Sequence, residues 1–439
     1  MISIQIKKKI KKLKSREIFA KIIRFLSLPD MVVLIGMRQV GKTSLLYLLI
    51  DYLLKIKKIP ESNVFYFSLD DPIIFNSFNK NIKELEVYLG SQKTNQKYKK
   101  YILIDEIQYL NNPTAFLKYY YDNFSDYKFI VTGSSTFEIR RKFKDSLAGR
   151  KKIVDIAPLS FKEFLAFKNN KEVFNFLDFN KVNKIKKNKI SVIVAEKLKA
   201  NLEEYLLFGG HPKITELKSR DLKIEELKDI YNSYIKKDVK DIGKIENAGA
   251  YNNLIQILSS QIGNLVNVKE LSNTLNINQI TLNKYIFLLE NTFIVYLLKP
   301  FFQNKRKEIS KMPKLYFEDL GIRNMIVNDF RKLDLRNNLG AIAENFIFNE
   351  LNKKLAVTDE LYFWRTISKQ EVDFVLKKEN KIIPIEVKYQ NFKKSQITIG
   401  MKNFIELYQP KQAIIITKDY QDFIKINKCE VYFIPVYLI

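Results

Sequence analysis

Residues 31–50 read MVVLIGMRQVGKTSLLYLLI: an apolar run, a glycine-bounded loop and a leucine-rich run follow one another without a gap. An apolar run bounded by glycine predicts a buried strand, and the leucine-rich segment predicts a helix packed on the sheet. Between them, residues 36–43 match the pattern G-x-x-x-x-G-K-[ST]. The order strand, loop, helix predicts a phosphate-binding loop, with the binding residues Gly36, Met37, Arg38, Gln39, Val40, Gly41, Lys42, Thr43 and Ser44.

The residue types of this loop suit an anion. Gly36 and Gly41 allow a tight turn, so that several N–H groups and the positive end of the next helix point at one phosphate. We expect Lys42 to reach the β- and γ-phosphates and the Thr43 hydroxyl to hold Mg²⁺. The alternative is a chance glycine-lysine turn, and the flanking strand and helix argue against it.

The composition indicates a folded, strongly basic chain. Its 439 residues, with a hydrophobic fraction of 46%, suffice for several domains with buried cores. Lys+Arg 75 against Asp+Glu 48 gives a net charge of +27, so we expect a polyanionic partner, either nucleic acid or anionic membrane. A generally Lys-, Ile- and Asn-rich composition explains the charge equally well, because the basic residues are spread along the chain.

Cysteine and histidine occur once each. The lone Cys429 excludes an intrachain disulfide and argues against a cysteine-based metal site, and the lone His211 argues against Ser-His-Asp catalysis and multi-histidine zinc sites. No apolar run approaches the roughly 18 residues of a spanning helix, and the basic residues 7–12 lack the apolar core of a signal peptide. We therefore expect a cytoplasmic protein without a membrane span, whose chemistry rests on carboxylates, lysines and Mg²⁺.

A pair of acidic residues follows the loop. Residues 64–69 and 100–106 predict a second and a third strand, and the third ends in Asp105 and Glu106. About 60 residues after a phosphate loop, this is the arrangement called Walker B. We expect Asp105 to bind Mg²⁺ through its waters and Glu106 to polarise the attacking water as general base. The alternative for Glu106 is an exposed charge at a strand end.

Two more strands complete the predicted sheet. Residues 128–135 predict a fourth strand that ends in small hydroxyl residues, and Ser134 is the candidate to hydrogen-bond the γ-phosphate or the lytic water. An ordinary Gly-Ser turn is the alternative. Residues 152–156 predict a fifth strand. Alternating strands and helices predict an α/β fold with a parallel sheet and a ligand at the carboxyl ends of its strands.

Three further segments carry a family resemblance. They are SLAGR at residues 146–150, PLSFKEF at 158–164 and YLLFGGHP at 205–212. With them the chain resembles, from about residue 15 to about 430, the archaeal and bacterial AAA-type ATPases that carry a C-terminal restriction-endonuclease-like domain of unknown function. The resemblance implies an ATPase.

The resemblance also implies roles for single residues. Gly210 and Pro212 match a glycine-x-proline motif that lies against adenine in the helical lid of related ATPases, with a helix-breaking turn as the alternative. Arg150 is a candidate to complete a γ-phosphate site, in cis or from a neighbouring subunit, and a structural ion pair explains it equally well. The acid pair and the Gly-His-Pro element favour ATP over GTP.

Residues 268–298 predict a winged helix-turn-helix. Two helices, at 268–275 and 279–291, are followed by a strand at 293–298. The second helix of such a domain enters the major groove of DNA. The face expected to be exposed carries polar but only weakly basic residues, so protein contacts are an equal alternative.

The last part of the chain holds a constellation of acidic residues and a lysine. Glu344 lies in a helical pattern at 339–355, Asp373 in one predicted strand, and Glu386 and Lys388 share one face of another. This order resembles the PD-(D/E)xK nuclease fold, in which Asp373, Glu386 and also Glu344 would bind Mg²⁺ and Lys388 would orient the nucleophilic water. The alternatives are a fold kept for binding after cleavage is lost and a surface salt-bridge network.

We therefore predict an α/β protein of five parts. These are a basic N-terminal helix at 1–25, a P-loop AAA-like core at 26–165, a helical lid and connector at 166–245, a winged helix-turn-helix at 246–315 and a PD-(D/E)xK nuclease-like domain at 316–439. The leading hypothesis is an ATPase, with ATP and Mg²⁺ as cofactors, whose nucleotide state changes how the C-terminal modules engage nucleic acid. The alternatives are an ATP-gated Mg²⁺-dependent nuclease and an ATP-driven switch that binds a protein partner. The sequence predicts no oligomeric state.

Overall fold

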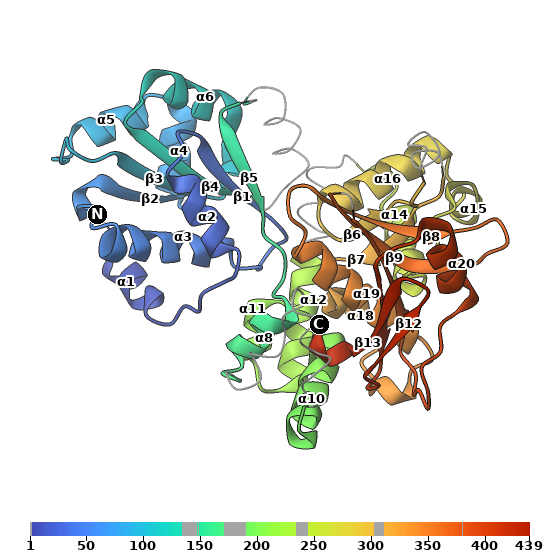
Figure 1. The fold of residues 1–439 in the computed structure, drawn as a ribbon. Helices are drawn as coiled ribbons and strands as arrows, with labels where there is room; N and C mark the ends of the chain where they lie inside the picture. Colours follow the sequence, from blue (N-terminus) through green and yellow to red (C-terminus); the bar gives the residue numbers. More distant parts are fainter. Residues whose placement is uncertain are drawn as a thin grey trace. The chain divides into compact units, whose positions relative to one another are not determined.

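The computed structural model describes residues 2–133, 147, 149–170, 190–233, 245–302, 311–379 and 381–439. The chain forms two compact units, one made mainly of Met1–Ala157 and one mainly of the residues from Pro158 onward. Each unit is built around its own sheet (Figure 1).

A parallel sheet forms the centre of the first unit. Its strands are β1 (Met31–Ile35), β2 (Val64–Ser68), β3 (Lys100–Asp105), β4 (Tyr127–Gly133) and β5 (Lys151–Asp155). They lie in the order β2-β3-β4-β1-β5, and every pairing is parallel. This confirms the predicted α/β sheet. Because β1 lies between β4 and β5, the loop that follows β1 begins at an inner strand of the sheet and not at an edge strand.

Helices cover both faces of this sheet (Figure 1). On one face, α3 contacts β3 and β4, α1 packs on α3, and α2 packs on β1. On the other, α4, α5 and α6 share a core with Val33 and Ile35 of β1. The bounds are α1 (Ile4–Ile10), α2 (Phe19–Leu26), α3 (Lys42–Asp51), α4 (Pro72–Lys80), α5 (Glu84–Gly90) and α6 (Pro113–Asn123).

The basic N-terminal segment forms two helices, α1 and α2, where the sequence analysis expects one. Like charges crowd residues 7–12, which disfavours a continued helix. The break leaves Arg16 outside both helices, and its side chain is buried there. The turn between α1 and α2 is therefore packed against the rest of the first unit.

The second unit begins with a group of helices. They are α8 (Phe161–Phe167), α10 (Val192–Phe208), α11 (Pro212–Glu216) and α12 (Arg220–Ser233). Because α8 packs on α10 and α11, the chain passes from the first unit to the second before α8 begins. A Ser160–Glu163 capping box starts α8, since each residue's side chain accepts a hydrogen bond from the other's backbone N–H.

Three helices and a two-stranded ladder follow. They are α14 (Ala248–Ser260), α15 (Val268–Thr274), α16 (Gln279–Asn291), β6 (Val295–Leu298) and β7 (Lys314–Phe317). The two strands pair antiparallel, with Val295 opposite Phe317. The order of these elements is the one expected of a winged helix-turn-helix, and that assignment remains a prediction.

A mixed sheet of six strands ends the chain. Its order is β12-β13-β11-β10-β9-β8, in which β10 pairs parallel with β11 and antiparallel with β9. The strands are β8 (Asp359–Arg365), β9 (Glu371–Lys378), β10 (Lys381–Lys388), β11 (Gln412–Thr417), β12 (Asp422–Ile426) and β13 (Cys429–Pro435). The helices of this part are α18 (Leu320–Ile326), α19 (Leu339–Lys353) and α20 (Ile399–Tyr408). Of these, α19 contacts β10 and β7, and α20 contacts β9 and β10.

Candidate functional site

The loop after β1 turns sharply into α3. Gly41, at the N-cap of α3, has φ of 94°, a left-handed conformation that a side chain disfavours. At Gly36 a Cβ atom would lie 2.2 Å from the carbonyl oxygen of Ile156, so only glycine fits against the chain after β5. Both glycines of the motif are therefore required by the backbone itself.

Lys42 lies against this loop. Its Nζ donates hydrogen bonds to the carbonyl oxygens of Gly36 at 3.0 Å and Met37 at 2.7 Å. The side chain is buried, with 5% of its surface exposed. The ammonium is thus held over the backbone turn that the pattern G-x-x-x-x-G-K-[ST] predicts.

The Asp105 carboxylate at the end of β3 accepts hydrogen bonds from three hydroxyl groups. Thr43 Oγ1 donates to Oδ2 at 2.7 Å and the Tyr66 hydroxyl donates to the same oxygen at 3.2 Å. Thr132 Oγ1 donates to Oδ1. Burial raises the pKa of Asp105, and the Thr132 and Thr43 hydrogen bonds oppose that rise. The hydroxyl and the carboxylate predicted to serve Mg²⁺ are therefore in direct contact.

Glu106 continues from Asp105 in a left-handed conformation, with φ of 59°. The strand ends at Asp105, directly before this residue. The Glu106 N–H donates to Thr132 Oγ1 at 3.0 Å, and Gln108 Nε2 donates to Glu106 Oε2. Glu106 is half-buried. One hydroxyl, that of Thr132, therefore positions both members of the acid pair.

Arg16 joins the N-terminal turn to the loop. Its guanidinium donates to the carbonyl oxygens of Val40 at 3.0 Å and Ala157 at 2.9 Å. The side chain is buried. Because Val40 lies inside the phosphate-binding motif, the hydrogen bond from Arg16 stabilises the loop.

Two predicted residues of the first unit lie elsewhere. Ser134 falls outside the described residues. Arg150 forms an ion pair with Asp122 of α6, with Nε 2.8 Å from Oδ1, and both side chains are about one-third exposed, at 33% and 37%. This is the structural ion pair that the sequence analysis gives as the alternative for Arg150.

Gly210 and Pro212 lie at the junction of α10 and α11 in the second unit. The Gly210 N–H donates to Asp319 Oδ2 at 2.8 Å, and His211 Nδ1 lies 3.3 Å from the same oxygen. Burial acts to raise the pKa of the Asp319 carboxyl, but the neighbouring His211 imidazole and the backbone N–H groups of Gly210 and Ile322 together hold that pKa below its usual value. Pro212 begins α11. The motif thus has a packing role inside this unit, and its contact with adenine remains a prediction.

The four residues of the nuclease-like set lie near one another. The Val387 N–H donates to Asp373 Oδ2 at 2.8 Å, which joins β9 to β10. Lys388 Nζ lies 2.9 Å from Glu386 Oε1. Glu344 of α19 interacts electrostatically with Asp373, and this, after burial, raises the pKa of Glu344 to about 7. The predicted element order therefore brings the set together.

A lysine that the sequence analysis does not identify lies inside this set. Lys314 of β7 is 2% exposed, and its Nζ lies 2.9 Å from Glu344 Oε1 and 3.7 Å from Asp373 Oδ1. It also pairs with Glu371 Oε1. Among the described residues, no group of three or more acidic, histidine or cysteine side chains could hold a metal ion.

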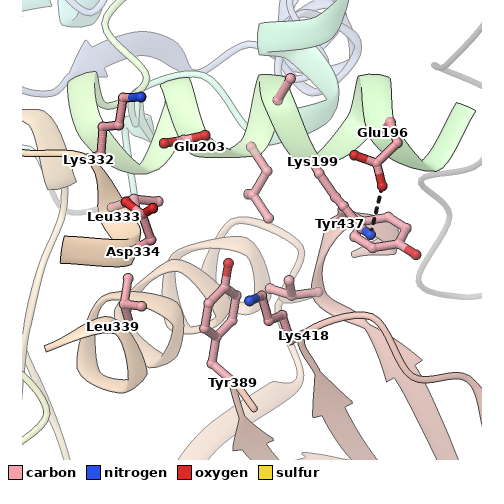
Figure 2. A pocket seen from close by; sticks show the side chains of 13 residues that line it. Glu196, Lys199, Glu203, Lys332, Leu333, Asp334, Leu339, Tyr389, Lys418 and Tyr437 are labelled. Atoms are coloured by element: carbon pink, nitrogen blue, oxygen red, sulfur yellow. Dashed lines mark hydrogen bonds and ion pairs between the residues drawn. The ribbon is translucent and has the colours of Figure 1, made fainter. Parts of the chain in front are cut away.

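The second unit also contains a cavity of about 430 Å³, to which α10 contributes Glu196, Lys199 and Glu203 (Figure 2). Tyr389, Lys418 and Tyr437 line it from the part of the chain that carries the mixed sheet. Lys199 pairs with Glu196 at 3.0 Å, so these two charges neutralise each other. The arrangement identifies no ligand.

Sequence reasoning misses Thr132, Tyr66, Arg16 and Lys314. Thr132 stands two residues before the chosen Ser134, and strand alternation alone does not say which hydroxyl faces Asp105. Lys314 carries a usable signal, since it opens the short apolar strand KLYF, where a charge demands a partner. Arg16 carries no such signal among 75 lysines and arginines.

Comparison with known proteins agrees with the first unit. A family described as an AAA domain matches residues 29–165, and two families described as domains of unknown function, DUF8612 and DUF4143, match residues 199–334 and 339–439. The C-terminal match names no endonuclease, so that likeness remains a prediction. Among the described residues, none of the helices is long and apolar enough to cross a membrane.

Relatives match nearly the whole chain. The uncharacterized protein MJ1544 of Methanocaldococcus jannaschii is 31% identical over 395 residues, which cover 88% of this chain and 80% of the relative. An uncharacterized protein of Haemophilus influenzae is 25% identical over 435 residues, covering 97% of this chain and 98% of the relative. The solved structure of AMPPCP-bound DnaA from Aquifex aeolicus aligns with 62% of this chain and 86% of its own, at 19% identity. The TM-score of this alignment is 0.25, which is too low to support a conclusion.

Proposed function

Because this chain belongs to the family of AAA-domain proteins that includes MJ1544 of Methanocaldococcus jannaschii, we propose that it is a Mg²⁺-dependent ATPase. The observation that carries the proposal is the contact between Thr43 Oγ1 and Asp105 Oδ2, at 2.7 Å, beside the buried Lys42. The hydroxyl after the motif lysine and the strand-end carboxylate are the two groups that hold Mg²⁺ in P-loop enzymes.

The residues present fit a magnesium nucleotide. The left-handed Gly41 and the start of α3 form a backbone cradle for phosphate oxygens, and Lys42 supplies the positive charge. Thr43 and Asp105 supply the oxygen ligands that Mg²⁺ prefers. A bound magnesium ion would neutralise the charge of the β- and γ-phosphates.

Glu106 is the proposed general base. Its backbone N–H is fixed by Thr132 and its side chain by Gln108, so its orientation is set by β4 and by the turn after β3. A carboxylate that is half-buried and positioned in this way can accept a proton from water. Thr132 is a positioning residue, since it acts through Asp105 and Glu106.

We further propose that the nucleotide state changes how the C-terminal modules engage a nucleic acid. The net charge of +27 supports a polyanionic partner. Two large apolar side chains on α16, Ile280 at 83% exposed and Phe287 at 51%, instead favour a protein partner for that helix. The protein-binding switch is therefore the second candidate function.

The test is ATP turnover with and without duplex DNA. Under the proposal, wild-type turnover rises when DNA is added, and the rise disappears between roughly 50 and 200 mM salt, because phosphate contacts release counterions. Turnover that ignores DNA at low salt would reject the nucleic-acid coupling and leave the protein-binding switch. Absence of Mg²⁺-dependent turnover under all conditions would reject the ATPase itself.

A further inference from the structure

Lys314 occupies the middle of the carboxylate cluster. It lies on β7, two residues before Tyr316, so both side chains extend from the same face of the strand. Both reach Glu344: Lys314 Nζ is 2.9 Å from Oε1, and the Tyr316 hydroxyl donates to the same oxygen at 2.6 Å. The same ammonium faces Asp373 at 3.7 Å and pairs with Glu371. A single cation thus joins three carboxylates from α19 and β9.

The carboxylate oxygens of Asp373 and Glu386 have partners within the protein. Asp373 Oδ2 accepts from the Val387 N–H at 2.8 Å, and Oδ1 faces Lys314. Glu386 Oε2 accepts from the Thr398 hydroxyl at 2.7 Å, and Oε1 pairs with Lys388 at 2.9 Å. Each oxygen therefore has a partner without a metal ion.

The charges of the cluster also balance closely. Arg365 adds a third cation through a 2.6 Å ion pair with Glu371 Oε2. Three basic side chains face four acidic ones: Lys314, Arg365 and Lys388 against Glu344, Glu371, Asp373 and Glu386. A divalent ion would add two positive charges to a cluster in which three cations already offset three of the four carboxylates.

We propose that the Lys314 ammonium takes the place that a divalent metal ion holds in a PD-(D/E)xK nuclease site, so that this domain binds no Mg²⁺ and does not cleave phosphodiesters. The carboxylates of the set then form an internal ion-pair network that joins β7, β9, β10 and α19. The inference is independent of ATP hydrolysis by the first unit.

The test is a titration of the full chain with Mn²⁺, in which binding is measured from the electron paramagnetic resonance signal of the Mn²⁺ that stays free. The chain lacks nucleotide and carries Asp105→Asn, which removes the other carboxylate proposed to serve a divalent ion. We expect no stoichiometric site with Lys314 intact. Lys314→Ala removes the central cation and should tighten Mn²⁺ binding at least about tenfold, since carboxylate oxygens then lack their counter-charge.

Two matched variants serve as controls, one that removes a lysine elsewhere and one that keeps the positive charge at position 314. Lys377→Ala removes a lysine of β9 whose Nζ lies 2.8 Å from Glu360 at the surface, and it should bind no more Mn²⁺ than the parent. Lys314→Arg keeps the charge and should likewise gain no site. Incubation of the wild type with Mg²⁺ and supercoiled plasmid should leave the plasmid uncut.

Three results would overturn the proposal. The first is a stoichiometric Mn²⁺ site in the chain with Lys314 intact that is lost in Asp373→Asn. The second is Mg²⁺-dependent cleavage of the plasmid that is lost in Asp373→Asn. The third is a Lys314→Ala chain that keeps its circular dichroism spectrum but gains no Mn²⁺ site. If Lys314→Ala fails to fold, the first two measurements, made with Lys314 present, decide the matter.

Discussion

Replacing Thr132 with valine isolates the role of one hydroxyl in the proposed ATPase site. Thr132 is fully buried, and valine is β-branched like threonine, so the substitution removes the hydroxyl while the side chain keeps nearly the same shape. The change removes the hydrogen bond to Asp105 Oδ1 and the acceptor of the Glu106 N–H, which lies 3.0 Å away. Both members of the acid pair lose their common support.

The size of the effect follows from these two hydrogen bonds. A bond to a charged group contributes about 1.5–3 kcal/mol and a neutral one about 0.5–1.5 kcal/mol. Asp105 keeps the donors Thr43 and Tyr66, which limits its displacement. If about half of the sum appears in the activation free energy, kcat falls roughly 5- to 50-fold.

The assay is phosphate release from ATP at saturating Mg²⁺, with kcat and KM determined separately. A positioning role predicts a lower kcat with KM changed less than about threefold, because Lys42 and the loop are untouched. Thr132→Ser keeps the hydroxyl and should retain most of the activity. A Thr132→Val enzyme with wild-type kcat would refute the reasoning.

Three other substitutions test separate parts of the structure. Arg16→Met removes the donors to the carbonyl oxygens of Val40 and Ala157. It should weaken ATP binding by about 5- to 30-fold in a fluorescent-nucleotide titration, because a loosened loop costs about 1–2 kcal/mol of binding free energy. Substitution of the exposed Arg24 by methionine is the control, and equal affinities of the two variants would contradict the prediction. Lys128→Met removes the ammonium donor of the carbonyl oxygens of Phe25 and Leu28, which lie 2.9 and 2.7 Å from Nζ. The change should lower the free energy of unfolding by about 2–4 kcal/mol in urea titrations, whereas a loss below about 0.5 kcal/mol would count against it. Glu344 has a pKa raised to about 7, so the native state binds its proton more tightly than the unfolded chain does, and its contribution to stability is full below the unfolded pKa and declines as pH rises toward about 7. Between pH 5 and 7 the wild type should therefore lose roughly 2–3 kcal/mol relative to Glu344→Gln, and parallel pH profiles of the two proteins would disprove this.

The first unit is predictable where its constraints are local. The phosphate-binding motif encodes its own backbone, because Gly36 and Gly41 are needed for close approach and for a left-handed turn. The Asp105–Glu106 pair is predictable because a parallel sheet places its strand ends at one edge. These predictions rest on a few neighbouring residues and need no knowledge of the tertiary fold.

The residues that support the site depend on contacts that are distant in the sequence. Arg16 reaches Ala157 across the unit, and nothing in the residues near Arg16 indicates this. The choice between Thr132 and Ser134 depends on where β4 ends, and strand ends are the least certain feature of a sequence pattern. The acceptor of a side chain is therefore harder to predict than the element that carries it.

Several basic side chains have a structural role in the interior. Lys42, Lys128, Lys314 and Arg323 are each 5% exposed or less. Lys128 donates to the carbonyl oxygens of Phe25 in α2 and of Leu28 just after it, and burial lowers the pKa of Lys128 to about 8. Lys314 balances carboxylates in the C-terminal cluster. Acidic side chains such as Asp105, Asp319 and Glu386 are buried as well, so burial removes little of the net charge of +27 from the surface.

The most direct test of the ATPase proposal is to measure ATP binding and ATP turnover in the same three proteins: the wild type, Lys42→Ala and Glu106→Gln. We predict that Glu106→Gln binds Mg²⁺-ATP as tightly as the wild type but hydrolyses it at least about 100-fold more slowly, since it lacks only the general base. Lys42→Ala should lose binding itself. Wild-type turnover in Glu106→Gln, or undiminished binding in Lys42→Ala, would contradict the proposed site.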